Sequence, residues 1–296
     1  MKTLLFLSLI VVGFLTIKMQ PKEYIASADI NPFDRPVASC GTFSPFNFPD
    51  SVMPVKLLTG LGDLNHPVTT KVPLAQKFFN QGLSYLYAFN HAEAIRSFNK
   101  VSELDPGCAM AYWGMAHAYG PNINMPMTEE AEKLAFDAIQ KATALLPKVS
   151  RQDAAYIRAL ALRYDNKPGD QATSDSAYLR AMKQVTRDFP DDPDAQTLYA
   201  DAVMNTFAWQ YWEAGGKFKP KAAEVLTILE NVIRKHPNHT GAHHLLVHLV
   251  EGSNQPARGL KSADALAGLM PKAGHIVHMP SHIYIRTGNF DRAAQS

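Results

Sequence analysis

Prolines divide much of this chain into segments of similar length, and their spacing limits the possible folds more than any other feature does. Five of them follow one another at intervals of 34 to 47 residues: Pro106, Pro147, Pro190, Pro237 and Pro271. A small residue stands ten positions after three of them, at Ala116, Ala200 and Ser281, and Val247 fills the same slot less well. Proline ends a helix because it lacks the N–H that the next turn needs, and such periods are typical of stacked helical pairs. We therefore predict an all-α array over residues 71–296, with five helical hairpins and a truncated sixth.

The first unit carries the clearest pattern. Its residues are Phe78, Gly82, Tyr85, Ala94, Phe98 and Pro106. Gly82 and Ala94 are small, so two helices can approach closely, and the aromatic rings fill the space between them. The order and spacing resemble the tetratricopeptide-repeat (TPR) family, with Phe78 in place of tryptophan and Gln81 in place of leucine. The resemblance implies a TPR-like right-handed α-solenoid of antiparallel helical hairpins. It also implies that the first helices line a concave groove that recognises a protein or peptide ligand.

Two insertions lengthen the repeats, at residues 120–126 and 207–216. Both fall between the two helices of a hairpin, so we expect both to project from the same rim of the array. The second is aromatic and contains Trp209, Tyr211 and Trp212. Loops this long often have a function. These aromatic residues either cap the neighbouring helices or form a lip over the groove, where they would contact a ligand.

Histidines gather at the end of the sequence: eight of the eleven lie between His236 and His282. His244 and His248 stand three before and one after the small slot of the fifth unit, and His278 and His282 hold the same offsets in the sixth. Residues four apart share a helix face. The resemblance implies that both pairs point into the groove from adjacent helices.

Four imidazoles facing one another are suited to a transition metal, Zn or Cu, rather than to Ca or Mg. We therefore interpret His244, His248, His278 and His282 as candidate metal ligands. Asp201 holds the same offset in the fourth unit, and Glu251 lies one turn beyond His248. Either carboxylate could bind the ion or orient an imidazole.

Other histidines have different expected roles. We expect His117 and His275 to line the groove, and His236, His239 and His243 to be capping or core groups. The segment from His244 to His248 lacks the glutamate of an HExxH motif, so it does not indicate a zinc protease. Pro280 is tolerated only in a first helical turn, which predicts a helix start near His278.

The N-terminus differs from the repeats. Residues 1–20 join Lys2 to an apolar run and are predicted to be a signal peptide or an N-terminal membrane anchor. Cleavage at residues 26–28, lipidation at Cys40 and an uncleaved anchor all stay open. Residues 21–70 are predicted to be an extended linker or cap. We therefore expect a protein that is exported, periplasmic or extracellular, or tethered to the membrane.

Cys108 is expected to be a packing residue, although a disulfide with Cys40 is an alternative.

Composition adds one exclusion. The net charge is +2, from 29 basic and 27 acidic residues, and no basic stripe with interleaved aromatics is present. We therefore expect no nucleic-acid partner.

Two functions follow from the sequence. One is a scaffold whose concave groove recognises a protein or peptide, and the other is a metal-binding protein or metal-dependent enzyme that uses the four histidines. Whether the chain is an enzyme stays open.

Overall fold

The computed structural model describes residues 54–164 and 171–296, all within the larger of the two units into which the chain divides, Ser39–Ser296. The smaller unit, Met1–Ala38, lies outside the described residues. The predicted targeting segment 1–20, the candidate cleavage site at 26–28 and Cys40 also lie outside them. No helix within the described ranges is long and apolar enough to cross a membrane.

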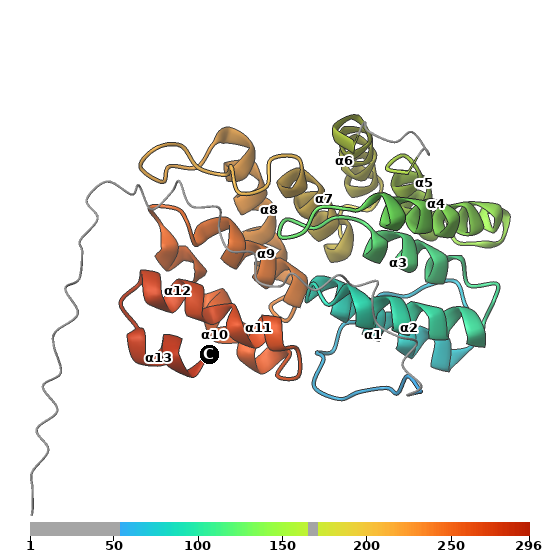
Figure 1. Ribbon diagram of the computed structural model, residues 1–296, viewed down its shortest axis with the longest axis horizontal. Helices are drawn as coiled ribbons and strands as arrows, with labels where there is room; N and C mark the ends of the chain where they lie inside the picture. The colour runs from blue at the N-terminus through green and yellow to red at the C-terminus, as the bar shows by residue number, and fades with distance from the viewer. Residues whose placement is uncertain (1–53, 165–170) are drawn as a thin grey trace, which may run out of the picture. The chain divides into compact units, whose positions relative to one another are not determined.

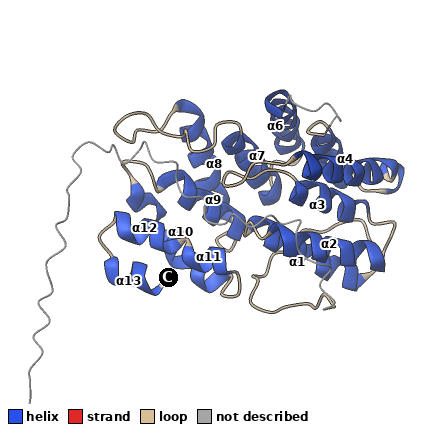
Figure 2. Cartoon of the chain, viewed as in Figure 1, coloured by secondary structure: helices blue, strands red, loops and turns tan. Residues whose placement is uncertain are grey.

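The described residues form helices joined by turns and by loops, two of which are long (Figure 1; Figure 2). The first four hairpins are α1 (Pro73–Tyr87) with α2 (His91–Leu104), α3 (Ala109–Tyr119) with α4 (Glu129–Ala144), α5 (Arg151–Ala161) with α6 (Gln171–Asp188), and α7 (Pro193–Asn205) with α8 (Pro220–Lys235). Then follow α9 (Thr240–Val250) with α10 (Leu260–Leu269), and α11 (Gly274–His278) and α12 (Pro280–Arg286) with α13 (Phe290–Gln295). Short 3₁₀ helices occur at Leu146–Lys148 and Pro256–Gly259. Each helix packs on its neighbours in the chain, which confirms the predicted all-α array of antiparallel helical hairpins.

Small residues set the spacing of the first hairpin, as the sequence predicts. A Cβ atom added to Gly82 of α1 would stand 2.7 Å from the ring of Phe98 in α2, and Phe98 is fully buried. Asn90 caps α2 by accepting a hydrogen bond from the backbone N–H of Glu93. Asp192 caps α7 in the same way. Cys108 is buried and free, in agreement with a packing role.

Replacing Gly82 with alanine is expected to destabilise the fold by about 1–3 kcal/mol, because the new methyl group overlaps the Phe98 ring. Gly268 in α10 is the matched control, since a Cβ there meets nothing within 4 Å. Gly268→Ala should gain up to about 1 kcal/mol from helix propensity. Urea denaturation of both variants measures the difference, and equal stabilities would contradict the packing argument.

The inner helices contact one another across the array. Helix α9 packs against α1 and α7 as well as against α8 and α10. Gly241 of α9 lies so close to the Tyr87 ring of α1 that an added Cβ would stand 2.5 Å from it. The segment before α1 adds a further link, because the carbonyl of Gly60 accepts a hydrogen bond from the backbone N–H of Lys272. The first hairpin therefore contacts the fifth directly, and α9 is enclosed by other helices.

Candidate metal centre

Helix α9 is buried along its whole length, so its polar side chains need partners within the protein. His239 caps it, because its Nδ1 accepts a hydrogen bond from the backbone N–H of Ala242. His243 binds the hydroxyl of Ser262 and the carbonyl of Pro237. Both are therefore capping or core groups, as expected. His236 is exposed at the end of α8.

His244 is held with one ring nitrogen directed at the backbone and the other at a second histidine. Its Nδ1 lies 2.6 Å from the carbonyl oxygen of Tyr87. A carbonyl only accepts hydrogen bonds, so Nδ1 carries the proton and Nε2 of the neutral ring carries the lone pair. That Nε2 lies 2.9 Å from Nε2 of His275 in α11. At this distance either His275 donates an Nε2–H to the lone pair of His244, or both nitrogens bind a cation between them.

His248 is oriented by a carboxylate. Its Nδ1 lies 2.9 Å from Oε1 of Glu251. Burial raises the pKa of Glu251, but hydrogen bonds from His248 and His282 outweigh this and hold that pKa at about 2. Glu251 is therefore an ionised acceptor, Nδ1 of His248 donates to it, and Nε2 carries the lone pair. This Nε2 is buried and has no hydrogen-bond partner in the part of the chain that the structure describes.

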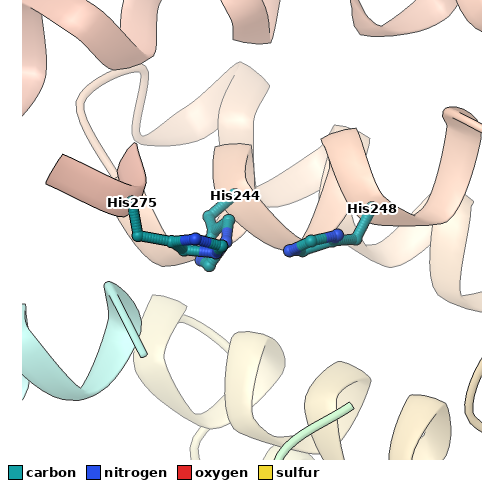
Figure 3. A group of neighbouring side chains, drawn as sticks. All are labelled: His244, His248 and His275. Carbon is teal, nitrogen blue, oxygen red and sulfur yellow. The ribbon is translucent and has the colours of Figure 1, made fainter. Parts of the chain in front are cut away.

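The ligating nitrogens of His244, His248 and His275 lie within 4.8 Å of one another (Figure 3). Burial, followed by the neighbouring imidazoles, lowers the pKa of His244 well below its usual range and that of His275 to about 3. Both rings are therefore neutral near pH 7. A neutral imidazole whose other nitrogen is fixed by an acceptor, as Nδ1 of His244 is by the Tyr87 carbonyl, is the usual form of a metal-binding histidine.

The other predicted ligands, His278 and His282, lie on the far side of Glu251. Nδ1 of His282 lies 2.5 Å from Oε2 of Glu251, and Nε2 of His282 lies 3.0 Å from Nε2 of His278. The structure thus joins His244 and His248 to His275 and leaves the other two histidines as a separate pair. Glu251 lies between the two groups and contacts Nδ1 of both His248 and His282. The helical backbone begins at Gly274, earlier than expected, and Pro280 interrupts it between α11 and α12.

Two aromatic rings enclose the histidines at some cost in backbone strain. Among the described residues, Phe89 (φ 54°) and Trp209 (φ 61°) are the only ones other than glycine with positive φ. The Phe89 ring centroid lies 4.5 Å from that of His244 and 5.8 Å from that of His248, and the Trp209 centroid lies 5.6 Å from that of His248. Such strain costs about 1–3 kcal/mol per residue and is typical of functional sites.

The aromatic insertion folds back onto the array. The indole N–H of Trp209 donates to the carbonyl of Ile123, which joins the two insertions as their shared rim predicts. Trp212 donates to the carbonyl of Leu249 near the end of α9. Tyr211 is buried and donates to the carbonyl of Met204. Trp212 and Tyr211 thus cover neighbouring helices, while Trp209 also contacts the histidine cluster.

Asp201 and His117 are placed together, away from the three clustered histidines. Both line a cavity of about 20 Å³, enough for about one water molecule, with His91, Asn122 and Phe89 among the other lining residues. Burial raises the pKa of Asp201 to about 6. Asp201 does not belong to the groups of described side chains whose ligand atoms gather closely enough for an ion.

A second polar cluster surrounds Asp194 and supports the first. Asp194 accepts hydrogen bonds from the Tyr87 hydroxyl at 2.6 Å, from Nδ1 of His66 at 2.7 Å and from Nε2 of His239 at 3.2 Å. The carboxylate of nearby Asp192 accepts from Tyr156, Gln152 and two backbone N–H groups. Protein donors therefore already surround both carboxylates. This cluster fixes Tyr87, whose carbonyl in turn fixes His244.

Comparisons with known proteins find similarity among solved structures. No protein-family model and no curated protein matches the chain. A solved structure that resembles it is the crystal structure of YrrB, described as a TPR protein with an unusual peptide-binding site. The two share 17% identity with a TM-score of 0.34, over 69% of this chain and 90% of the other.

Proposed function

We propose that this protein binds a transition-metal ion, Zn or Cu, through Nε2 of His244, His248 and His275. The observation that carries the proposal is the convergence of these three nitrogens within 4.8 Å, one of them buried and without a hydrogen-bond partner. A buried polar atom without a partner costs about 1–3 kcal/mol, so such atoms are rare unless something binds them. Nitrogen donors favour Zn or Cu over Ca or Mg.

The distances are close to those that an ion requires. With Zn–N bonds of about 2.0–2.1 Å and tetrahedral angles, the nitrogens of two ligands stand roughly 3.3 Å apart. The 2.9 Å between His244 and His275 is near this value. The upper limit of 4.8 Å means that small rotations of the imidazoles suffice to close the site. Three protein ligands leave a fourth position for water or another small ligand.

Metal content tests the proposal directly. The untagged protein is expected to contain about one transition-metal ion per chain after purification, or after incubation with Zn²⁺ or Cu²⁺. Mass spectrometry measures the bound metal. His248→Ala/His275→Ala should lose it, because each substitution removes a ligand. His236→Ala is the matched control, since this histidine is exposed and outside the cluster. Absence of bound metal in the wild type, even after incubation, would refute the proposal.

Protein or peptide binding in a concave groove stays a prediction from the repeat pattern. Helix α9 contacts both α1 and α7 where the groove was expected, and the space that the structure shows between these helices is a cavity of about 20 Å³. This is why the metal centre, the second function that the sequence suggests, is the one that the geometry favours.

A further inference from the structure

His278 and His282 form a second pair of opposed imidazoles. Their Nε2 atoms lie 3.0 Å apart, and both side chains are partly exposed, unlike those of His244 and His248. Nδ1 of His282 donates to the ionised Glu251, and Nε2 of the same ring is directed at Nε2 of His278. Burial lowers the pKa of His282, but Glu251 raises it overall, so a cation at Nε2 competes with a proton. As with His244 and His275, the two facing nitrogens need a proton or a cation between them.

Glu251 separates this pair from the buried centre. One carboxylate oxygen binds Nδ1 of His248 and the other binds Nδ1 of His282. The two nitrogens of an imidazole lie on opposite sides of the ring, so both Nε2 atoms point away from Glu251. One carboxylate therefore orients two histidines toward two different places. In many metal sites a carboxylate binds one nitrogen of a histidine whose other nitrogen binds the ion. Here a single glutamate contacts two histidines in this way.

The two places are close but distinct. The ring centroids of His248 and His282 are 6.4 Å apart, with Glu251 binding the inner nitrogen of each. Two cations at this range repel each other, and an ionised carboxylate between them offsets part of the repulsion. A single ion cannot bind the outward-facing Nε2 atoms of both rings unless the contacts with Glu251 break.

We propose that His278 and His282 bind a second ion of the same transition metal, at a solvent-facing site joined through Glu251 to the buried centre of His244, His248 and His275. The inference rests on the proposed function. Two protein ligands leave the remaining positions to water, so this site is weaker than the buried one. Its exposure gives an ion from solvent a first point of binding beside the buried centre.

Counting the bound ions of the metal-free full-length chain tests the inference. Zn²⁺ is added over a range of free concentrations by equilibrium dialysis, and bound ions are counted by mass spectrometry. The wild type should bind two ions, one tightly and one weakly. His278→Ala/His282→Ala should bind one, with the tight affinity within about threefold of the wild type, which also shows that the variant is folded. His244→Ala/His248→Ala should keep only the weak ion, and His236→Ala should bind two.

The other outcomes separate the two proposals. One ion in the wild type, unaffected by His278→Ala/His282→Ala, overturns the second site and leaves the buried centre standing. One ion that both double variants lose also overturns it, in favour of the single four-histidine site that the sequence predicts. No ion in the wild type overturns both proposals. Co²⁺ provides an independent check, because its visible absorption should show two distinct binding steps in the wild type.

Discussion

Asp194→Asn should destabilise the protein by about 3–5 kcal/mol, because it removes the charge from a buried, paired group. Asp194 accepts hydrogen bonds from Tyr87, His66 and His239, which come from three separate parts of the chain. An asparagine side chain of the same shape offers one acceptor oxygen instead of two and no charge. The segment before α1, helix α1 itself and helix α9 would lose their common partner.

The effect depends on pH in a definite direction. Burial opposes the ionisation of Asp194, but hydrogen bonds from His239 and His66 hold its pKa well below the usual range. Its contribution is therefore present above an unfolded pKa of about 3.9 and is lost as pH falls toward the folded pKa. Burial lowers the pKa of His66, yet Asp194 raises it overall. The contribution of His66 is present below an unfolded pKa of about 6.5 and is lost as pH rises through the folded pKa.

The destabilisation by Asp194→Asn should therefore be larger at about pH 5.5 than at about pH 9, since only the lower pH retains both contributions in the wild type. Urea denaturation at the two pH values measures it. Asp191→Asn is the matched control, because this side chain is 93% exposed and should change stability by less than about 0.5 kcal/mol. A loss for Asp194→Asn that is the same at both pH values would show that His66 does not carry the pH dependence.

The regular part of the fold is predictable because it depends on local signals. Prolines mark helix ends, Gly82 marks a close helix contact, and both follow from backbone chemistry that neighbours in sequence determine. His244 and His248 could also be singled out, because residues four apart on one helix share a face. Glu251 follows from the same reasoning, one turn further on.

The rest of the centre depends on contacts that no local pattern contains. Repeat equivalence pairs His244 with His278, but α11 is short and Pro280 divides the sixth unit, so His275 is the residue that meets His244. Phe89 and the carbonyl of Tyr87 join the site only because α9 packs against α1, more than a hundred residues away in the sequence. Such contacts depend on how all intervening repeats stack.

Strain offers a signal that sequence alone does not supply. The residue after a helix end commonly adopts positive φ and is commonly glycine. Phe89 holds such a position between α1 and α2, and its ring contacts all three clustered histidines. Glycine would relieve the backbone but remove the ring. Phenylalanine at this position therefore keeps an aromatic ring against the histidines at the cost of backbone strain, which is typical of functional sites.

The second large effect is expected for Glu251→Gln, which should weaken metal binding at the buried centre by about 10–100-fold. Glutamine keeps the size of the side chain but replaces one acceptor oxygen with an NH₂ group. Glu251 now accepts hydrogen bonds from Nδ1 of both His248 and His282. In the variant, one of these rings meets a donor instead, and its proton must move from Nδ1 to Nε2. The lone pair that would bind the ion is then lost from Nε2 of that ring. If that ring is His282, His248 still donates to a neutral amide oxygen rather than to a carboxylate, which makes its Nε2 a weaker ligand.

Two measurements on the metal-free protein and its variant distinguish this mechanism from a general loss of structure. Competition with a chelator gives the affinity for Zn²⁺, and nitrogen-15 NMR of the histidine side chains reports which ring nitrogen carries the proton. The wild type should show protonated Nδ1 in both His248 and His282, and Glu251→Gln should show protonated Nε2 in one of them. Glu230→Gln, which alters an exposed carboxylate paired with Arg258, is the control and should change neither quantity. If Glu251→Gln bound Zn²⁺ as tightly as the wild type with both protons still on Nδ1, the carboxylate would not be the group that sets the ligating nitrogens, and backbone placement of α9 alone would have to account for the centre.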